Sequence, residues 1–371
     1  MRLGYFTMPM HPLHRNWAET LQEDREIVML ADKLGFYDAF IGEHLTDANE
    51  NITNSLLFLA TLISETTNIK LATGTTNLTQ QHPTLIATHA AMFDHLAKGR
   101  FIMGISPGNL KTDAEAIGNL DEADRTKLFE EAIDVILEIW TRDPPYNIDL
   151  PNNRFKVSTA KHARLEIGLG ILGKPYQKPY PEIVGTVVAP YSKGVIAMGR
   201  RDFHPLSANF LLPKWVKTHW ANYLQGKKEV GKTPDITEWR VARTIFVCED
   251  DKVAARYARH DANSPYLFYF QQLLAKFRAS GRLALFKDRM DQPDSEITDD
   301  CVMDSLVWYG SVNKIVDHIL AFREEIGEFG ELVYCGVDWT DPALSRRSME
   351  LLATEVMPRV NSAIGTSVAA Q

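Results

Sequence analysis

Polar side chains that could hydrogen-bond a ligand stand at the ends of several short apolar runs in this 371-residue chain. Glu43 and His44 follow the run 37–42, and Thr75 and Asn77 stand at the end of the run 69–76. Further such positions are His82, Ser106, Asn109, Tyr191 and Ser192, and the apolar Met8 follows the first run. Since these groups are mostly neutral, they suit a large planar ligand with polar edges against an apolar wall better than glycoside hydrolysis, which needs paired carboxylates.

Alternation of short apolar runs with longer amphipathic runs predicts the elements that position these groups. The expected strands are 2–7, 37–42, 69–76, 101–105, 182–185, 205–210, 238–247 and 331–336. The expected helices are 16–34, 54–66, 84–96, 124–140, 192–199, 214–228, 311–326 and 342–360. Strand–helix alternation favours parallel strands with crossover helices, and functional groups then gather at the carboxyl ends of the strands.

Eight strand–helix pairs predict an α/β fold, a (β/α)₈ TIM barrel with insertions. The alternative is a doubly wound open sheet with a second domain. We expect one domain over residues 1–371, because no linker or shift in composition divides the chain. The insertions are expected at about 144–181, which holds six prolines, and at about 262–310. The second lies within residues 250–310, a segment that we expect to be helical and that is aromatic with poor regularity.

The composition argues against several classes of function. The formal charge of −8, without a basic stripe, gives no support for binding nucleic acid or an anionic membrane. No apolar run reaches the length of about 18 residues that spans a bilayer. Three isolated cysteines and the absence of a signal peptide favour a cytoplasmic protein.

The sequence holds neither a complete dinucleotide-binding pattern nor a zinc-binding pattern. Residues 168–173 read Gly-Leu-Gly-Ile-Leu-Gly and match a dinucleotide-binding pattern, but Pro175 and Pro179 follow where that pattern needs a helix. The histidines and cysteines show no zinc-binding spacing, so we expect no metal.

Three segments resemble the bacterial luciferase-like flavin-dependent monooxygenases. They are Gly42-Glu43-His44, Gln81-His82-Pro83 and the run 93–105, which reads Phe-Asp-His-Leu-Ala-Lys-Gly-Arg-Phe-Ile-Met-Gly-Ile. The resemblance extends over roughly residues 1–360, and it is greatest to the limonene-monooxygenase-like and diketocamphane-monooxygenase-like branch. Pro107 and Leu45 depart from luciferase itself, which argues against light emission.

The resemblance implies a two-component monooxygenase that binds FMN as FMNH₂, supplied by a separate flavin reductase. Reaction with O₂ would give a C4a-peroxyflavin. One oxygen would then enter a small hydrophobic or cyclic organic substrate by hydroxylation, epoxidation or Baeyer–Villiger oxidation. A homodimer through the helices after the second and third strands is also implied.

The resemblance also assigns roles to single residues. His44 would be the catalytic acid or base beside the flavin, against the alternative of a hydrogen-bonded rim histidine. Gly74 and Thr75 match a non-proline cis bond or bulge beneath the flavin ring, and Asn77 follows them at the cofactor. Tyr191 and Ser192 match a phosphate-binding turn, against the alternative of an ordinary helix cap.

The resemblance also implies the remaining assignments. Asn109 is expected at the flavin edge or phosphate. Arg125 lies where some members of the family bind the phosphate, and its alternative is a solvated charge in the first turn of a helix. Met8 and His82 are expected near the substrate, and the alternative for His82 is the start of the helix at Pro83. Two other functions stay open: F420-dependent hydride transfer and a non-catalytic flavin-binding paralogue.

Overall fold

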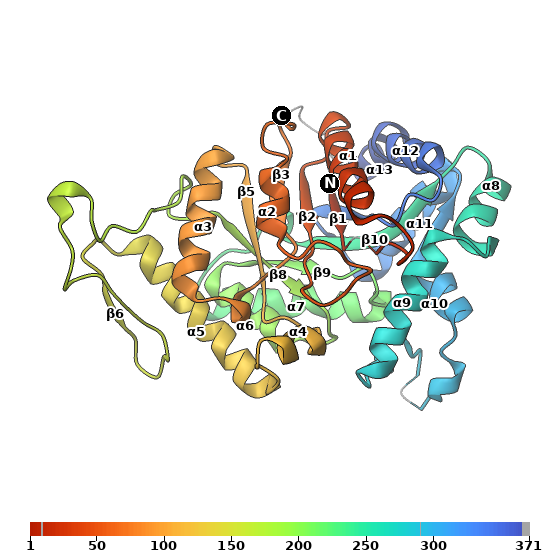
Figure 1. Cartoon of the computed structure of the whole chain (residues 1–371). Helices are drawn as coiled ribbons and strands as arrows, with labels where there is room; N and C mark the ends of the chain where they lie inside the picture. Colours follow the sequence, from red (N-terminus) through yellow and green to blue (C-terminus); the bar gives the residue numbers. More distant parts are fainter. Residues whose placement is uncertain (9, 290, 366–371) are drawn as a thin grey trace. The chain divides into compact units, whose positions relative to one another are not determined.

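The computed structural model describes residues 1–8, 10–289 and 291–365 (Figure 1). Two compact units make up the chain. Unit 1 consists of Met1–Ala39 with Gly185–Gln371, and unit 2 is Phe40–Val184. The boundaries between the units fall inside two strands, β2 (Asp38–Ile41) and β8 (Glu182–Val187). The prediction of a single domain over the whole chain stays a prediction.

Among the described residues, eight parallel strands close into a barrel. They run in the order β1, β2, β3, β5, β8, β9, β10 and β12, and β12 pairs with β1 in register from Arg2↔Glu331 to Phe6↔Cys335. The strands not yet bounded are β1 (Arg2–Thr7), β3 (Lys70–Thr73), β5 (Phe101–Ser106), β9 (His204–Ser207), β10 (Arg240–Val247) and β12 (Glu331–Cys335). These are the eight strands that the sequence predicts, so the barrel is confirmed.

The strands of the barrel are buried on both faces, which explains why their sequences are continuous apolar runs. All eight residues of β10 and all five of β12 are buried. Two of the charged side chains, Arg240 and Glu331, are paired with each other and are fully buried. The strands β10 and β12 are therefore part of the buried core of unit 1.

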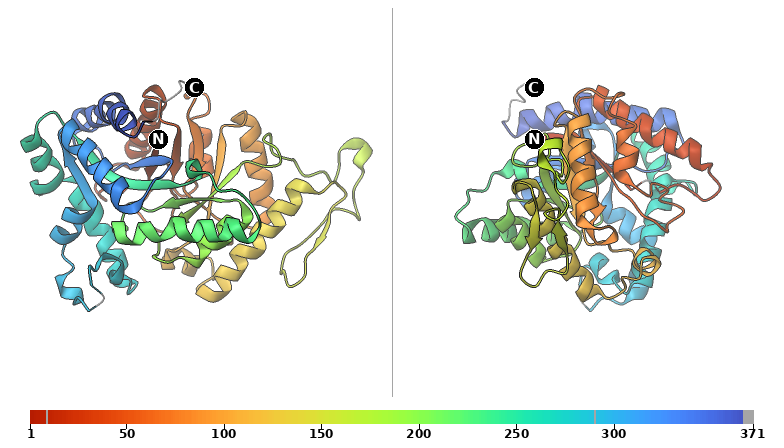
Figure 2. Two further views of the ribbon diagram at one scale, coloured as in Figure 1. Left: turned by 180° about the vertical axis from the view of Figure 1, so that it is seen from behind. Right: turned by 60° about the vertical axis from the view of Figure 1, so that its left-hand side comes forward.

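Unit 1 also holds the helices that follow its strands (Figure 2). The Asn16 side chain accepts hydrogen bonds from the first-turn N–H groups of α1, which explains where that helix begins. The helices are α1 (Trp17–Lys33), α6 (Lys193–Arg201), α7 (Pro213–Glu229), α8 (Asp251–Ala255), α9 (Pro265–Ala279), α10 (Asp299–Leu306), α11 (Val312–Ile326), α12 (Pro342–Leu351) and α13 (Met357–Ala363).

Unit 2 carries four α-helices among its described residues, and a long hairpin segment extends from it (Figure 1). The helices are α2 (Ser55–Ala60), α3 (Pro83–Leu96), α4 (Lys111–Ala116) and α5 (Glu122–Thr141). The short strand β4 (Thr76–Asn77) pairs with the end of β5. Within the predicted insertion 144–181, β6 (Asn147–Asp149) and β7 (Lys156–Ser158) form an antiparallel pair.

Part of the expected structure is wrong in detail. The segment 250–310 was expected to be helical, but Val307–Gly310 forms a strand, β11, parallel to the last four residues of β10. The predicted helix 54–66 is helical only to Ala60, and the predicted strand 205–210 ends at Ser207. Among the described residues, no helix is long and apolar enough to cross a membrane.

Candidate functional site

His44 is held on one side by Asp113, a residue of the short helix α4. The Nδ1 atom of His44 lies 2.9 Å from Asp113 Oδ2, and Thr46 donates to Asp113 Oδ1 from its N–H at 2.9 Å and its hydroxyl at 2.6 Å. Burial alone would raise the pKa of Asp113, but the hydrogen bonds from His44 and Thr46 outweigh burial and lower it. An ionised Asp113 can only accept, so Nδ1 of His44 carries a hydrogen.

The other ring nitrogen of His44 faces a second carboxylate. His44 Nε2 lies 3.5 Å from Glu50 Oε2, and the Glu50 side chain is 3% exposed. The imidazole is itself only 14% exposed. His44 therefore lies between two buried carboxylates, an arrangement that can hold a proton and pass it on at Nε2.

Glu43, beside His44, fastens three segments of unit 2 together. Its Oε2 accepts hydrogen bonds from the N–H and the hydroxyl of Ser55, both at 2.7 Å, and its Oε1 accepts from the N–H of Asn77 at 3.2 Å. Burial raises the pKa of Glu43 in spite of these donors. Glu43 thus ties the end of β2 to the start of α2 and to β4.

Three of the predicted cofactor residues in unit 2 lie together, around Ser106. The Thr75 hydroxyl donates to Ser106 Oγ at 2.8 Å, and the Ser106 hydroxyl donates to Asn77 Oδ1 at 2.7 Å. The peptide bond between Gly74 and Thr75 is cis, one of the two forms that the resemblance implies. A Cβ on Gly74 would lie 2.9 Å from Phe40 Cβ and 3.1 Å from the Phe40 carbonyl carbon, so a side chain does not fit there.

The other predicted residues of unit 2 are more dispersed. Asn109 is exposed in the loop before α4. Arg125 is buried and donates to the carbonyl oxygens of Asn119 and Leu120 at 3.1 and 3.4 Å, so it is not a solvated charge. His82 is the N-cap of α3, where its Nδ1 accepts from the N–H of Thr84 at 3.2 Å. Ligand contacts for these three residues stay predictions.

Three predicted residues belong to unit 1. Met8 is partly buried directly after β1. Tyr191 is 67% exposed with φ at 51°, and its N–H donates to Thr218 Oγ1 at 3.0 Å. Ser192 is the N-cap of α6, and its side chain makes no capping hydrogen bond. Contact of Tyr191 and Ser192 with a phosphate, and of Met8 with substrate, stay predictions.

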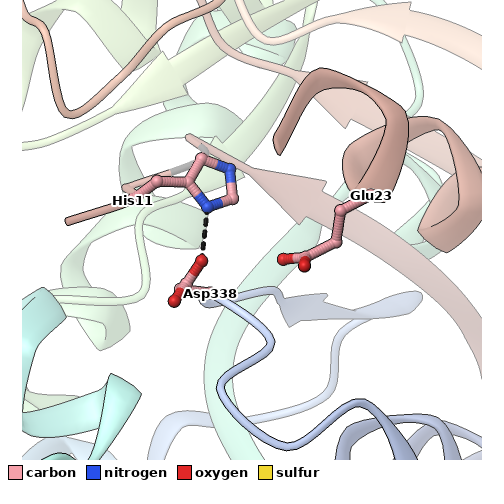
Figure 3. A group of neighbouring side chains, drawn as sticks. All are labelled: His11, Glu23 and Asp338. Atoms are coloured by element: carbon pink, nitrogen blue, oxygen red, sulfur yellow. Dashed lines mark hydrogen bonds and ion pairs between the residues drawn. The ribbon is translucent and has the colours of Figure 1, made fainter. Parts of the chain in front are cut away.

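A buried charged cluster in unit 1 was not predicted (Figure 3). His11 Nδ1 lies 2.5 Å from Asp338 Oδ1, and His11 Nε2 lies 3.2 Å from Asp24 Oδ2. Burial would lower the pKa of His11, but the two carboxylates raise it to about 9. Since His11 follows β1 and Asp338 follows β12, inspecting both strand ends would have found this pair.

The side chains of His11, Asp338 and the neighbouring Glu23 are of types that can bind a metal ion. His11, Glu23 and Asp338 offer ligand atoms within 4.8 Å of one another. However, Arg15 donates to Asp338 at 2.5 Å and to Glu23 at 2.9 Å, and a protonated His11 cannot ligate. The cluster is therefore an ion-pair network that joins the segment after β1 to the segment after β12.

Comparison with known proteins places the chain in a family. The profile of the luciferase-like monooxygenases matches residues 1–328. The chain is 28% identical over 366 residues to 4-hydroxyprotoasukamycin monooxygenase of Streptomyces nodosus subsp. asukaensis, which covers 97% of this chain and 92% of that protein. Limonene 1,2-monooxygenase of Rhodococcus erythropolis is 26% identical over 98% of this chain and 87% of its own length.

Solved structures agree with the sequence comparisons. The oxygenating constituent of 3,6-diketocamphane monooxygenase of Pseudomonas putida, a type II Baeyer–Villiger monooxygenase solved with FMN, superposes with a TM-score of 0.86. It is 26% identical and covers 97% of this chain and 98% of its own. An F420-dependent secondary alcohol dehydrogenase shares the fold alone, with a TM-score of 0.68 at 16% identity. The chain is therefore an enzyme of the luciferase-like monooxygenase family.

Proposed function

We propose that this enzyme is the oxygenating component of a two-component monooxygenase. It takes FMNH₂ from a separate flavin reductase and uses O₂ to oxidise a small hydrophobic or cyclic organic substrate in the cytoplasm. Bound reduced FMN supplies the electrons that activate O₂, so that one oxygen atom enters the substrate and the other leaves as water. The observation that carries the proposal is His44, held between Asp113 and Glu50 beside the Thr75–Ser106–Asn77 network.

The residues of this network fit a flavin. The Thr75 and Ser106 hydroxyls and the Asn77 amide are neutral groups that can exchange hydrogen bonds with the polar edge of a planar ring. Gly74 lets the chain pass close to Phe40 of β2 beside these groups, because a Cβ there would lie 2.9 Å from Phe40 Cβ. We expect Thr75 and Asn77 to hold the ring, and Arg125 with Tyr191 and Ser192 to serve the phosphate as the resemblance implies.

His44 performs the proton chemistry in this proposal. Asp113 holds the hydrogen on Nδ1 and fixes the orientation of the ring, so Nε2 is the atom that gives or takes a proton. Glu50, 3.5 Å from Nε2, is placed to accept that proton or return it. Because the imidazole and both carboxylates are largely buried, water has little access to the proton.

A labelled-oxygen experiment tests the proposal. The enzyme is mixed anaerobically with chemically reduced FMN and a panel of cyclic ketones and terpenes, and ¹⁸O₂ is then admitted. We expect one labelled oxygen atom in the product of at least one substrate, and none when FMNH₂ is omitted. Hydride transfer from reduced F420 with no incorporation from O₂ would replace the proposal by the F420-dependent alternative. Tight FMN binding without turnover on any substrate would favour a non-catalytic paralogue.

We also propose that the enzyme is a homodimer through α2 and α3, as the resemblance implies. Supporting this, α3 exposes Leu85, Met92 and Leu96, and α2 exposes Leu57, which is 72% accessible. Measuring the mass of the enzyme in solution tests this part separately from the reaction.

A further inference from the structure

The loop between β8 and α6, residues 188–192, holds Tyr191 in an unusual backbone conformation. Its φ is 51°, in the left-handed region that residues with a side chain adopt less readily than glycine. The side chain is 67% exposed, so burial of the ring does not impose this value. Contacts to the backbone of the loop must hold it, and residues held in this way cluster at functional sites.

Helix α7 supplies two of these contacts, from side chains four residues apart on one side of the helix. The hydroxyl of Thr218 donates to the Trp215 carbonyl at 2.7 Å, and its oxygen accepts from the N–H of Tyr191 at 3.0 Å. The Asn222 amide donates to the Ser192 carbonyl at 3.0 Å. Both residues of the loop that are expected at the phosphate are therefore bonded to α7 through their backbone.

A third contact from α7 comes from His219, which is fully buried. His219 Nε2 lies 3.0 Å from the Ala189 carbonyl oxygen, and its Nδ1 lies 2.8 Å from Ser207 Oγ. Burial lowers the pKa of His219 to about 4, so near neutral pH the ring carries a single hydrogen. A carbonyl oxygen can only accept, so this hydrogen is on Nε2.

The opposite side of the His219 ring is fixed by a chain of hydrogen bonds. Because Nδ1 carries no hydrogen, it accepts from the hydroxyl of Ser207. The indole N–H of Trp239, which can only donate, lies 2.9 Å from Ser207 Oγ and completes the chain. Each group in the chain has one possible direction, and His219 is therefore fixed as a donor to the loop.

Two glycines let α7 lie directly against α6 (Figure 1). A Cβ at Gly199 of α6 would lie 2.5 Å from the Tyr223 carbonyl oxygen. A Cβ at Gly226 of α7 would overlap the Ile196 carbonyl oxygen. Because both obstacles are backbone atoms, neither position takes a larger residue unless a helix moves. The backbones of α6 and α7 are therefore in contact, and α7 supports the helix that begins at the loop.

The proposed function already expects the FMN phosphate at this loop, and the first turn of α6 agrees with an anion there. The structure describes this turn in full, and it holds no acidic residue and begins with Lys193. A lysine at this position opposes the helix dipole, which an anion would offset. The side chain of Ser192 caps none of the first-turn N–H groups, so they are left to a ligand.

We infer that Thr218, His219 and Asn222 are positioning residues for the phosphate of FMN. They act on the backbone of the loop, so that Ser192 and the first N–H groups of α6 are in place before the cofactor arrives. A site that is ordered in advance binds more tightly, because less conformational entropy is lost on binding. The inference rests on the proposed function, since it needs FMN as the ligand, and it adds α7 to the residues that serve the phosphate.

Affinities for FMN and for riboflavin, which lacks the phosphate, test the inference. Thr218→Val, His219→Leu and Asn222→Leu each remove one contact to the loop, whereas Thr218→Ser and His219→Gln keep it. We expect each of the first three variants to bind FMN about tenfold more weakly, as loss of one hydrogen bond at a site does. Riboflavin affinity should change by less than about twofold, and the two conservative variants should bind FMN like the wild type.

Thr354→Val is the matched control. Thr354 is an exposed helical residue of unit 1 whose hydroxyl, like that of Thr218, donates to a carbonyl of its own helix, that of Glu350 at 2.8 Å. This variant should bind both flavins like the wild type. Thermal unfolding without flavin shows which variants fold, and if His219→Leu does not, the partly exposed Thr218 and Asn222 still provide the test.

The outcomes separate the role of α7 from the proposed function. Equal losses of FMN and riboflavin affinity would make the three contacts merely structural and would overturn the inference. A wild type that prefers FMN to riboflavin, with the same preference in all three variants, would overturn the role of α7 and leave the proposed function standing. A wild type that binds F420 but not FMN would overturn both.

Discussion

At the scale of single residues, the surroundings of His44 decide what its imidazole can do. An isolated rim histidine would have its protonation set by solvent, whereas His44 has Asp113 on Nδ1 at 2.9 Å and Glu50 near Nε2 at 3.5 Å. The first carboxylate orients the ring, and the second is placed to exchange a proton. Replacing Asp113 should therefore disturb the orientation of the imidazole, whereas replacing Glu50 should disturb proton exchange at Nε2.

His44→Asn is expected to lower kcat by about a hundredfold or more, the usual contribution of a general acid or base. Asp113→Asn should lower kcat by a smaller factor than His44→Asn, because the imidazole stays but loses the carboxylate that orients it. FMN affinity should change little in either variant. Glu115→Gln, an exposed change on the same helix α4, is the control. Steady-state rates with saturating FMNH₂ measure the effect, and an unchanged kcat for His44→Asn would remove the catalytic role.

Gly104 offers a residue-scale test of packing in unit 2. A Cβ at this position would lie 1.9 Å from the carbonyl oxygen of Thr73, and that atom belongs to the rigid backbone of β3. Gly104→Ala should therefore destabilise the protein by about 1–3 kcal/mol or more, as overpacking does. Gly173→Ala, where nothing lies within 4 Å, should change stability by less than about 0.5 kcal/mol. Urea unfolding of both variants makes the comparison, and equal stabilities would contradict the packing argument.

At the scale of elements, the cluster of His11, Asp24 and Asp338 joins the segment after β1 to the segment after β12. The pKa of His11 is raised from 6.5 to about 9, so the folded state binds its proton more tightly than the unfolded state. The stabilisation is complete below about pH 6.5 and is lost as the pH rises through 9. Burial raises the pKa of Asp24, the partner of His11, to about 6, so this carboxylate is ionised through the window in which His11 loses its proton.

The free energy of unfolding, measured by urea titration from pH 6 to 10, should therefore fall across the window from 6.5 to 9. His11→Asn should be less stable than wild type at pH 6 and should show a flatter profile. His14→Asn, an exposed histidine in the same segment, is the control. A wild-type profile that rises with pH through this window would contradict the assignment of the proton to His11.

Some strands and site residues of this protein could be predicted from the sequence, and others could not. The eight barrel strands were predictable because a strand that is buried on both faces has a short, mostly apolar sequence. Strand β11 was not, because Val307–Gly310 is extended through its pairing with β10, a contact that local sequence does not report. Thr75, Asn77 and Ser106 were found from their places at strand ends. Asp113 was missed because it lies 69 residues from His44 on a helix that was not predicted.

At the scale of the whole molecule, the midpoint of thermal unfolding can show which cofactor the enzyme binds. A ligand that binds only the folded state stabilises it by about 2.7 kcal/mol at a hundred times its Kd. We therefore expect FMN to raise the midpoint of thermal unfolding by several degrees in a concentration-dependent manner. F420 should have no such effect if the proposed function is correct, although the F420-dependent dehydrogenase shares the fold.

Riboflavin extends this measurement to the residues expected at the phosphate. Riboflavin has the ring of FMN without the phosphate, so the difference between their two shifts reports the phosphate interaction alone. Ser192→Ala should reduce the FMN shift toward the riboflavin shift, whereas Thr75→Val should reduce both shifts, because Thr75 is expected at the ring. If FMN and riboflavin stabilise the wild type equally, the phosphate roles of Arg125, Tyr191 and Ser192 are wrong. If only F420 stabilises it, the proton at His44 would serve hydride transfer instead of oxygen insertion.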